Sequence, residues 1–396
     1  MNVTRKKYHK NISLYYWYST FTNLLILGPI LTLFLLNKGL NFTQILTLQS
    51  ISAVGVVLLE VPTGAVADLI GRKLSILLGS LSIALSLLIY IYGTNFLAFA
   101  VAELTFSLGM SFKSGADTAL LYDTLKSLGQ EKNYKHIQSK CFSLALLAQA
   151  PGCIIAGYVF KINDDLPMLI SFCFMIITIN ITLFFKDIKL FQDTTSKPSY
   201  LSQIVHSGKF IISHAKIKAF VIFSMLFNIF FRAGFWFFQP YMKEVNIDIV
   251  YFGYIFALFN IVAAFSSHMA DKFTKKTKGK TLISLGILLL LSFILMGLTH
   301  IWIGFIFILL QQIARGLYRP IMMSYINKHI PSEKRATIIS FESLLKNLTV
   351  AITLPFIGML MDNTTIFNVH LILSLILLVC LIMMNKYLNS KLNTNN

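Results

Sequence analysis

Runs of about twenty apolar residues recur from one end of the chain to the other, and this pattern decides the fold class. A run of this length can cross a lipid bilayer as an α-helix. Of the 396 residues, 56% are hydrophobic and only 13% are charged, whereas about 25% of the residues in a soluble domain are charged. Membrane-spanning strands would instead alternate polar and apolar residues in segments of about ten. The sequence therefore predicts an all-α membrane protein.

The apolar runs predict twelve transmembrane helices, at about 14–36, 44–68, 74–92, 96–121, 139–160, 167–185, 217–242, 249–270, 281–299, 301–327, 336–361 and 365–385. If the N-terminus is inside, 26 of the 34 Lys and Arg residues lie in or beside inward-facing segments, and three lie in outward loops. This asymmetry follows the positive-inside rule, so we expect a cell-membrane protein with both termini in the cytoplasm. The net charge of +18 is explained by this topology, and no nucleic-acid partner is expected.

A short polar loop joins the second and third spans. It reads Gly64-Ala65-Val66-Ala67-Asp68-Leu69-Ile70-Gly71-Arg72-Lys73, with one acid and two bases at the membrane edge. Gly64 lacks a side chain where a neighbouring helix could press close, and Gly71 permits the backbone to reverse direction. The pattern Gly-x-x-x-Asp-x-x-Gly-Arg-Lys in this position resembles the signature loop of the major facilitator superfamily.

The resemblance extends over almost the whole chain. It is carried by the segments Ser114–Asp123, Arg315–Pro320, Tyr325–Asn327 and Arg335–Thr337. These segments are similar to a bacterial subgroup of the superfamily that is usually assigned to drug or small-molecule efflux. In the proton-antiporter branch the fifth span carries Gly-Pro-x-x-Gly-Gly, whereas here it reads Ala150-Pro151-Gly152. This departure weakens the expectation of proton antiport. It does not affect the expectation that the protein is a transporter.

The two halves of the chain repeat each other. Asp68 ends the second span and Asp271 ends the eighth, 203 positions later, and Tyr122 and Tyr325 end the fourth and tenth spans at the same separation. The resemblance therefore implies two pseudo-symmetric six-helix bundles, residues 1–185 and 217–396. The linker, residues 186–216, is either a short helix on the inner membrane surface or a mobile tether.

Nine ionisable residues lie within the predicted spans: Glu60, Glu103, Lys113, Asp117, Arg232, Arg315, Arg319, Glu342 and Lys346. Placing such a charged group in a bilayer costs several kcal/mol of free energy unless the group is paired with an opposite charge or hydrated. The resemblance implies that spans one, four, seven and ten line a central cavity, and five of the nine lie on those spans: Lys113, Asp117, Arg232, Arg315 and Arg319. A rise of about 1.5 Å per residue places Arg232 and Arg315 near the midplane, where such transporters bind substrates.

The cavity residues allow more than one interpretation. Lys113 and Asp117 are four residues apart, so they either neutralise each other on one helix face or exchange a proton at Asp117. The expected cavity contains four basic residues and one acidic residue. This excess favours a substrate or coupling partner with an anionic group, held by Arg232 and Arg315. Those arginines could instead bond backbone carbonyls or the opposite bundle. Glu103, in the outer half of span four, either takes up protons from outside or faces lipid.

Two sets of charges are candidates for opening and closing the molecule. Glu60 and Lys346 fall at matching depths on spans that are neighbours in the superfamily, so we expect an inter-bundle bridge there; a permanent structural pair is the alternative. Glu342 lies one turn before Lys346. On closure of the cytoplasmic side, Asp68 would lie against the positive amino end of span eleven near Arg335. Arg72 would then reach Asp123.

The sequence contains no complete phosphate-binding loop, no metal-ligand spacing and no catalytic cluster, so we expect neither an enzyme nor a cofactor. The combined features favour a monomeric secondary transporter in the lipid bilayer that exports a small organic molecule in exchange for protons. Uniport or symport of an anionic nutrient or lipid-like molecule is the alternative. A non-transporting sensor or scaffold would be expected to carry a soluble signalling domain.

Overall fold

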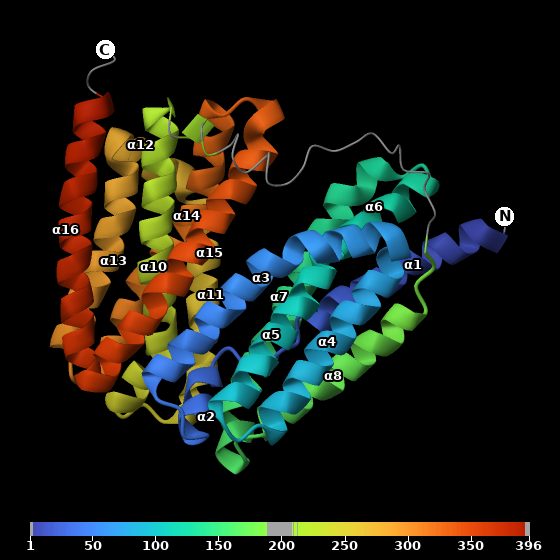
Figure 1. Ribbon diagram of the computed structural model, residues 1–396, viewed down its shortest axis with the longest axis horizontal. Helices are drawn as coiled ribbons and strands as arrows, with labels where there is room; N and C mark the ends of the chain where they lie inside the picture. Colours follow the sequence, from blue (N-terminus) through green and yellow to red (C-terminus); the bar gives the residue numbers. More distant parts are fainter. Residues whose placement is uncertain (1–2, 188–207, 209, 212, 393–396) are drawn as a thin grey trace. The chain divides into compact units, whose positions relative to one another are not determined.

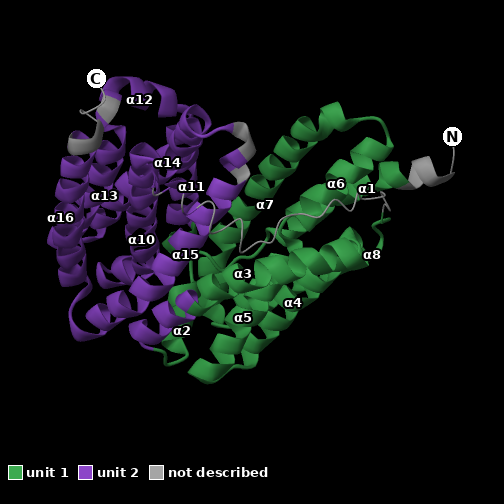
Figure 2. Ribbon diagram, turned by 45° about the horizontal axis from the view of Figure 1, so that its top comes forward, with its two compact units in different colours: residues 1–40, 51–195, 249–253 green, residues 41–50, 196–248, 254–396 purple. Residues whose placement is uncertain are grey.

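A computed structural model describes residues 3–187, 208, 210–211 and 213–392. Most of the linker predicted at 186–216, and with it most of the proposed interfacial helix, lies outside the described residues; residues 208, 210, 211 and 213 are described and helical. The chain divides into two compact units (Figures 1 and 2). Unit 1 comprises residues 1–40, 51–195 and 249–253, and unit 2 comprises residues 41–50, 196–248 and 254–396. Each unit therefore includes a short segment from the opposite half of the sequence.

Unit 1 is a helical bundle (Figure 1). Its helices are α1 (Val3–Thr22), α2 (Leu31–Asn37), α3 (Phe42–Ile70, whose first nine residues belong to unit 2), α4 (Arg72–Tyr92), α5 (Phe96–Lys113), α6 (Ala116–Ser127), α7 (Tyr134–Ile162) and α8 (Leu166–Leu183). Helix α4 packs against α5 and α8, while α1 packs against α6, α7 and α8. Buried side chains of α1, α4, α6 and α7 form one apolar core, which includes Tyr15, Tyr18 and Leu120.

Unit 2 is a second bundle. It contains α10 (Ala215–Glu244), α11 (Phe252–His268, whose first two residues belong to unit 1), α12 (Ala270–Thr277), α13 (Thr281–Leu298), α14 (Ile308–His329), α15 (Ser332–Asn363) and α16 (Ile366–Leu392). Helix α13 packs against α14 and α16, and α10 packs against α15 and α16. Aromatic side chains fill much of this core, and the rings of Phe227 and Tyr318 stack 4.2 Å apart.

The first turn of α3 is bound to the end of α15 within unit 2. A helix start leaves backbone N–H groups without partners. Here the Asp362 carboxylate accepts hydrogen bonds from the Phe42 N–H (2.8 Å), the Thr43 N–H (2.9 Å) and the Thr43 hydroxyl (2.5 Å). A side chain at Gly358 would come within 2.7 Å of the Thr43 Cα. This close approach explains why a glycine is needed there.

Within the described residues, ten helices are long and apolar enough to cross a membrane. The predicted all-α membrane fold is therefore confirmed. Spans one and ten do not meet the same criteria. Span one is broken between α1 and α2 by a turn that contains Gly28 and Pro29, and span ten carries Arg315 and Arg319 in α14.

The break in span one is stabilised by a distant side chain. Exposed backbone groups are tolerated at membrane depth only where other groups satisfy them. The Ile26 N–H donates a hydrogen bond of 3.1 Å to the Ser171 hydroxyl on α8. Ser171 is fully buried. The turn is thereby held against unit 1 rather than left free.

Span four is also broken, which corrects the prediction of one continuous helix over 96–121. Helix α5 ends at Lys113 and α6 starts at Ala116, with Gly115 between them at φ 77°. Only glycine adopts this left-handed backbone without strain. The break separates Lys113 from Asp117, so these two residues do not share one continuous helix face.

Replacing Gly253 with alanine is expected to destabilise unit 1. The new methyl group would overlap the Cys153 carbonyl oxygen and come within 2.6 Å of the Ile154 Cα. Backbone cannot move aside as a flexible side chain does, so we expect a loss of about 1–3 kcal/mol in unfolding free energy. Thermal denaturation in detergent measures it. The matched control is Gly28→Ala, whose methyl group would meet no atom within 4 Å, and equal midpoints for the two variants would contradict the prediction.

Candidate functional site

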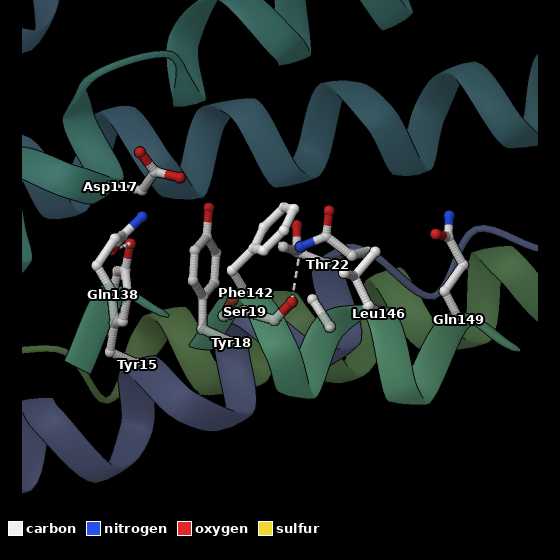
Figure 3. Close-up of a pocket in the computed structure, with 11 residues that line it drawn as sticks. Tyr15, Tyr18, Ser19, Thr22, Asp117, Gln138, Phe142, Leu146 and Gln149 are labelled. Carbon is white, nitrogen blue, oxygen red and sulfur yellow. Dashed lines mark hydrogen bonds between the residues drawn. The ribbon is translucent and has the colours of Figure 1, made fainter. Parts of the chain in front are cut away.

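A cavity of about 260 Å³ lies in unit 1 between α1, α6 and α7 (Figure 3). Eight of its eleven lining residues carry a polar group. Helix α1 and the residue after it contribute Tyr15, Tyr18, Ser19, Thr22 and Asn23; α6 contributes Asp117; and α7 contributes Gln138, Phe142, Ala145, Leu146 and Gln149. Asp117 is the one charged residue in this lining. The cavity therefore offers hydroxyl, amide and carboxylate groups to a small polar molecule.

Two tyrosines from adjacent turns of α1 shape the wall of this cavity. The Tyr15 hydroxyl donates a hydrogen bond of 3.3 Å to Gln138 Oε1. The Tyr18 hydroxyl is buried close to Thr22 but forms no well-aligned hydrogen bond. A buried hydroxyl without a partner is costly. This oxygen has almost no accessible surface, so it belongs to the packed wall of the cavity, beside Thr22.

Lys113 and Asp117 flank the cavity without forming an ion pair within 4 Å. Lys113 is 8% exposed; its ammonium donates a hydrogen bond to the Thr22 hydroxyl and lies 5.7 Å from the centre of the Tyr18 ring. Asp117 accepts a hydrogen bond of 2.6 Å from the Thr118 N–H in the first turn of α6. The helix start favours its negative charge. In this structure the two groups have separate hydrogen-bond partners, and mutual neutralisation and proton exchange at Asp117 both stay predictions.

The arginines predicted to line a cavity lie in unit 2. Arg315 donates hydrogen bonds to Gln312 Oε1 (3.1 Å) and to Asn260 Oδ1 (3.4 Å). Arg232 and Arg319 are exposed and form no hydrogen bond or ion pair with any described residue. Two guanidinium groups of this unit thus remain available for other partners.

Glu342 and Lys346 form a pair within unit 2. The Lys346 ammonium lies 3.0 Å from Glu342 Oε1, one turn earlier on α15. The Ser224 hydroxyl of α10 donates to the same oxygen, and it lies 2.5 Å from the Tyr318 hydroxyl of α14. Glu60 is exposed on α3. A bridge between Glu60 and Lys346 therefore stays a prediction, and the described partner of Lys346 is Glu342.

The loop between α3 and α4 holds its charges in place locally. Asp68 Oδ1 lies 2.8 Å from Arg72 Nη1, and Lys73 donates a hydrogen bond of 2.6 Å to the Leu183 carbonyl on α8. Gly71 has φ 97°, and a side chain there would overlap the Asp187 carboxylate, so the requirement for glycine is clear. A side chain at Gly64 would meet no atom within 4 Å, so no helix presses against it in this structure.

Of the remaining predicted gating residues, Asp123 interacts electrostatically with this loop, whereas Arg335 and Asp271 belong to unit 2. Arg72 attracts Asp123, which is half-buried on α6. Arg335 donates to the Asn327 and Ile330 carbonyls at the end of α14 (3.4 and 3.3 Å). Asp271 is exposed on α12 and forms no ion pair with a described residue. The contact of Asp68 with the start of α15 stays a prediction.

Sequence reasoning missed most of the neutral groups in these sites. Tyr15 and Tyr18 were not among the candidate site residues, and Gln138, Gln149, Ser224 and Tyr318 carried no motif. Only the unusual presence of amides in apolar spans could have indicated them. Glu103 is 5% exposed and accepts a hydrogen bond of 2.5 Å from Tyr90, so it faces the interior of unit 1. No cluster of potential metal ligands occurs among the described residues.

Comparisons with known proteins agree with this architecture. Residues 221–394 match the model of the Major Facilitator Superfamily. The uncharacterized MFS-type transporter YxaM of Bacillus subtilis (strain 168) is 23% identical over 343 residues, which is 84% of each chain.

Solved structures with the same fold include several transporters. The nucleoside transporter NupG superposes with a TM-score of 0.77 at 16% identity, covering 95% of this chain and 99% of its own. A POT family transporter in complex with a thioalcohol-conjugated peptide has a TM-score of 0.70 at 14% identity, covering 96% of each chain. These similarities establish the major facilitator fold, and together with the sequence matches they support a multi-pass membrane transporter of the major facilitator type, not an enzyme.

Proposed function

We propose that this protein is a secondary active transporter of the cell membrane that exports a small organic molecule in exchange for protons. The observation that carries the proposal is the cavity of unit 1, whose lining includes the carboxylate of Asp117 and the amides of Gln138 and Gln149. Alternating access would come from rocking of the two halves. The protein would work as a monomer with both termini in the cytoplasm.

The lining of the cavity favours a neutral or cationic molecule with a flat ring. Tyr15 and Tyr18 offer aromatic surface, and Gln138 and Gln149 offer both donors and acceptors. Asp117 is the acid of this lining and would exchange the coupling proton. The fold neighbours include nucleoside and peptide transporters, and molecules of those classes combine polar groups with compact size.

A second candidate is uptake, by symport or uniport, of an anionic nutrient or lipid-like molecule. It is favoured by Arg232 and Arg319, which have no partner among the described residues. Unpaired guanidinium groups in a membrane protein are expected to bind carboxylate or phosphate. A sensor or scaffold, by contrast, would need neither these charges nor the cavity.

Flux into liposomes with an imposed pH gradient tests these functions. The probes are ethidium, uridine, dialanine and benzoate, with protein-free liposomes as the control. Movement of ethidium or uridine against the proton flux, lost in Gln138→Leu, would support export through the unit 1 cavity. Entry of benzoate together with protons, lost in Arg232→Gln, would support the second candidate. Leakage at the protein-free rate for all four probes would contradict a transporter of small organic molecules.

A further inference from the structure

Helix α12 connects two helices that are long and apolar enough to cross a membrane. It follows α11 and precedes α13, and both belong to candidate membrane spans. The eight residues Ala270–Thr277 of α12 therefore lie at a membrane edge. Figure 1 shows α12 at the end of unit 2 where α16 ends. This is the side that is expected to face the cytoplasm.

The two faces of α12 differ in composition. On one face Ala270 is buried and Phe273 and Thr277 are half-buried, and the Thr277 hydroxyl lies 2.9 Å from that of Thr281 at the start of α13. The opposite face and the turn that follows it carry five lysines, all of them exposed: Lys272, Lys275, Lys276, Lys278 and Lys280. We call these five residues the α12 lysine cluster.

The protein offers few acidic partners to this cluster. Helix α12 packs against α13 and α14, and neither of these helices contains an acidic residue. The last turn of α14 adds two further bases, Lys328 and His329. The acid of α12 itself, Asp271, is exposed. Among the described residues no ion pair or hydrogen bond involves the ammonium groups of the cluster, and five positive charges against one negative charge leave an excess of four.

The equivalent loop in the first half of the chain binds its own bases. Asp271 lies 203 positions after Asp68, so α12 takes the place of the loop between α3 and α4. In that loop Arg72 Nη1 lies 2.8 Å from Asp68 Oδ1, and Lys73 donates a hydrogen bond to the Leu183 carbonyl. The second copy has more bases than the first, without the protein partners that hold them there.

The backbone at the end of α12 provides a separate observation. Lys278 has φ 48° and ψ −133°, which is close to the first central position of a type II′ turn, where glycine is favoured. The neighbouring Gly279 does not take this position. A lysine is unfavourable in such a conformation, so the backbone gives no reason for a lysine there. Its charge does, if the cluster has a partner outside the protein.

We propose that the α12 lysine cluster binds the phosphate groups of anionic lipids in the inner leaflet of the membrane. Clusters of about four to eight bases beside a membrane helix are attracted to anionic headgroups. An ammonium binds phosphate as a point charge, so exposed lysines need no fixed geometry. The position of α12 at the membrane edge favours a lipid over a soluble acidic partner, because headgroups are concentrated there. This inference goes beyond the proposed transport function and does not depend on it.

Native mass spectrometry of the full-length protein in detergent tests this binding, with dioleoyl phosphatidylglycerol and dioleoyl phosphatidylcholine as probes. The test variant is Lys275→Gln/Lys276→Gln. The matched control Lys132→Gln/Lys135→Gln removes the same charge from two exposed lysines, between α6 and the first turn of α7, that are expected on the same side of the membrane. Lys275→Arg/Lys276→Arg keeps the charge and covers a folding failure of the glutamine variant.

We expect wild type to bind phosphatidylglycerol more tightly than phosphatidylcholine. Lys275→Gln/Lys276→Gln should bind phosphatidylglycerol about tenfold more weakly, since each lysine near an anionic surface contributes separately to the attraction. The arginine variant and the control should stay within about twofold of wild type. Added salt should weaken the binding, because the charges are exposed and therefore screened.

Other results would overturn the site. Equal affinity of wild type for the two lipids, binding that is insensitive to salt, or an equal loss in Lys132→Gln/Lys135→Gln would show that α12 has no selective lipid site. Displacement of phosphatidylglycerol by an equal concentration of glycerol 3-phosphate would overturn the lipid and assign the cluster to a soluble anion. A wild type that moves no probe across liposomes but binds phosphatidylglycerol as expected would refute the proposed function and support this inference.

Discussion

Replacing Lys113 with methionine should abolish transport and at the same time make the purified protein more stable. The Lys113 ammonium is buried beside the unit 1 cavity with no carboxylate within 4 Å; its described partners are the Thr22 hydroxyl and the Tyr18 ring. An apolar side chain of similar length avoids the desolvation of that charge, so we expect a gain of about 1 kcal/mol in unfolding free energy. Lys113 holds the Thr22 hydroxyl, which lines the cavity, so loss of the ammonium should slow transport about a hundredfold, which corresponds to about 2.8 kcal/mol.

Thermal denaturation and liposome flux, measured on the same preparation, check both halves of this prediction. Lys243→Met is the control, because Lys243 is exposed at the end of α10 and outside the proposed sites. It should change neither quantity. Faster denaturation of Lys113→Met with full transport would show that Lys113 serves the fold and has no part in function.

Replacing Asp68 with asparagine should reduce transport about tenfold or more without affecting membrane insertion. In this structure Asp68 pairs with Arg72, and the side chains are 40% and 22% exposed. An exposed ion pair contributes only about 0.2–1 kcal/mol, so its loss is minor for stability. The proposed alternative partner is the start of α15, whose cap residue Pro331 makes no side-chain hydrogen bond. A carboxylate is favoured at such a helix start, whereas a neutral amide is not.

Flux per inserted molecule is the appropriate measurement, with membrane insertion followed separately. Asp164→Asn is a control because Asp164 is also an acid in a loop, between α7 and α8, where it accepts a hydrogen bond of 2.8 Å from Asn37. Its transport should equal that of wild type. Full activity in Asp68→Asn would remove Asp68 from the gating mechanism.

The sequence was sufficient to predict the helical membrane fold but not the interruptions in its helices. Length and apolar content determine whether a segment can cross a bilayer, and both can be counted along the chain. A break depends instead on partners far away in sequence, such as Ser171 for the Ile26 N–H. Gly28-Pro29 and Ser114-Gly115 are nevertheless recognisable turn signals inside predicted spans.

The candidate sites could be predicted only in part, because their contacts depend on packing as well as on sequence spacing. Asp68 and Arg72 are only four residues apart, but Gly71 at φ 97° separates their helices, so their ion pair spans a turn and does not follow from the spacing of one helix. Lys346 has two possible acids at suitable positions, Glu60 on another span and Glu342 on its own helix, and spacing alone cannot rank them. The neutral members of the sites, such as Gln138 and Tyr318, obey no spacing rule, because the packing of α7 and α14 determines what they face.

The distance between the cytoplasmic ends of the two halves tests the central claim, that the buried charges serve a transporter with two alternating states. Spin labels at the exposed positions 126 and 328, in a chain without its four native cysteines, can be measured by double electron–electron resonance in nanodiscs. We predict two distance populations whose proportions change between acidic and alkaline buffer in wild type and no longer change in Asp117→Asn. A single distance, identical in every buffer and with every probe, would contradict it.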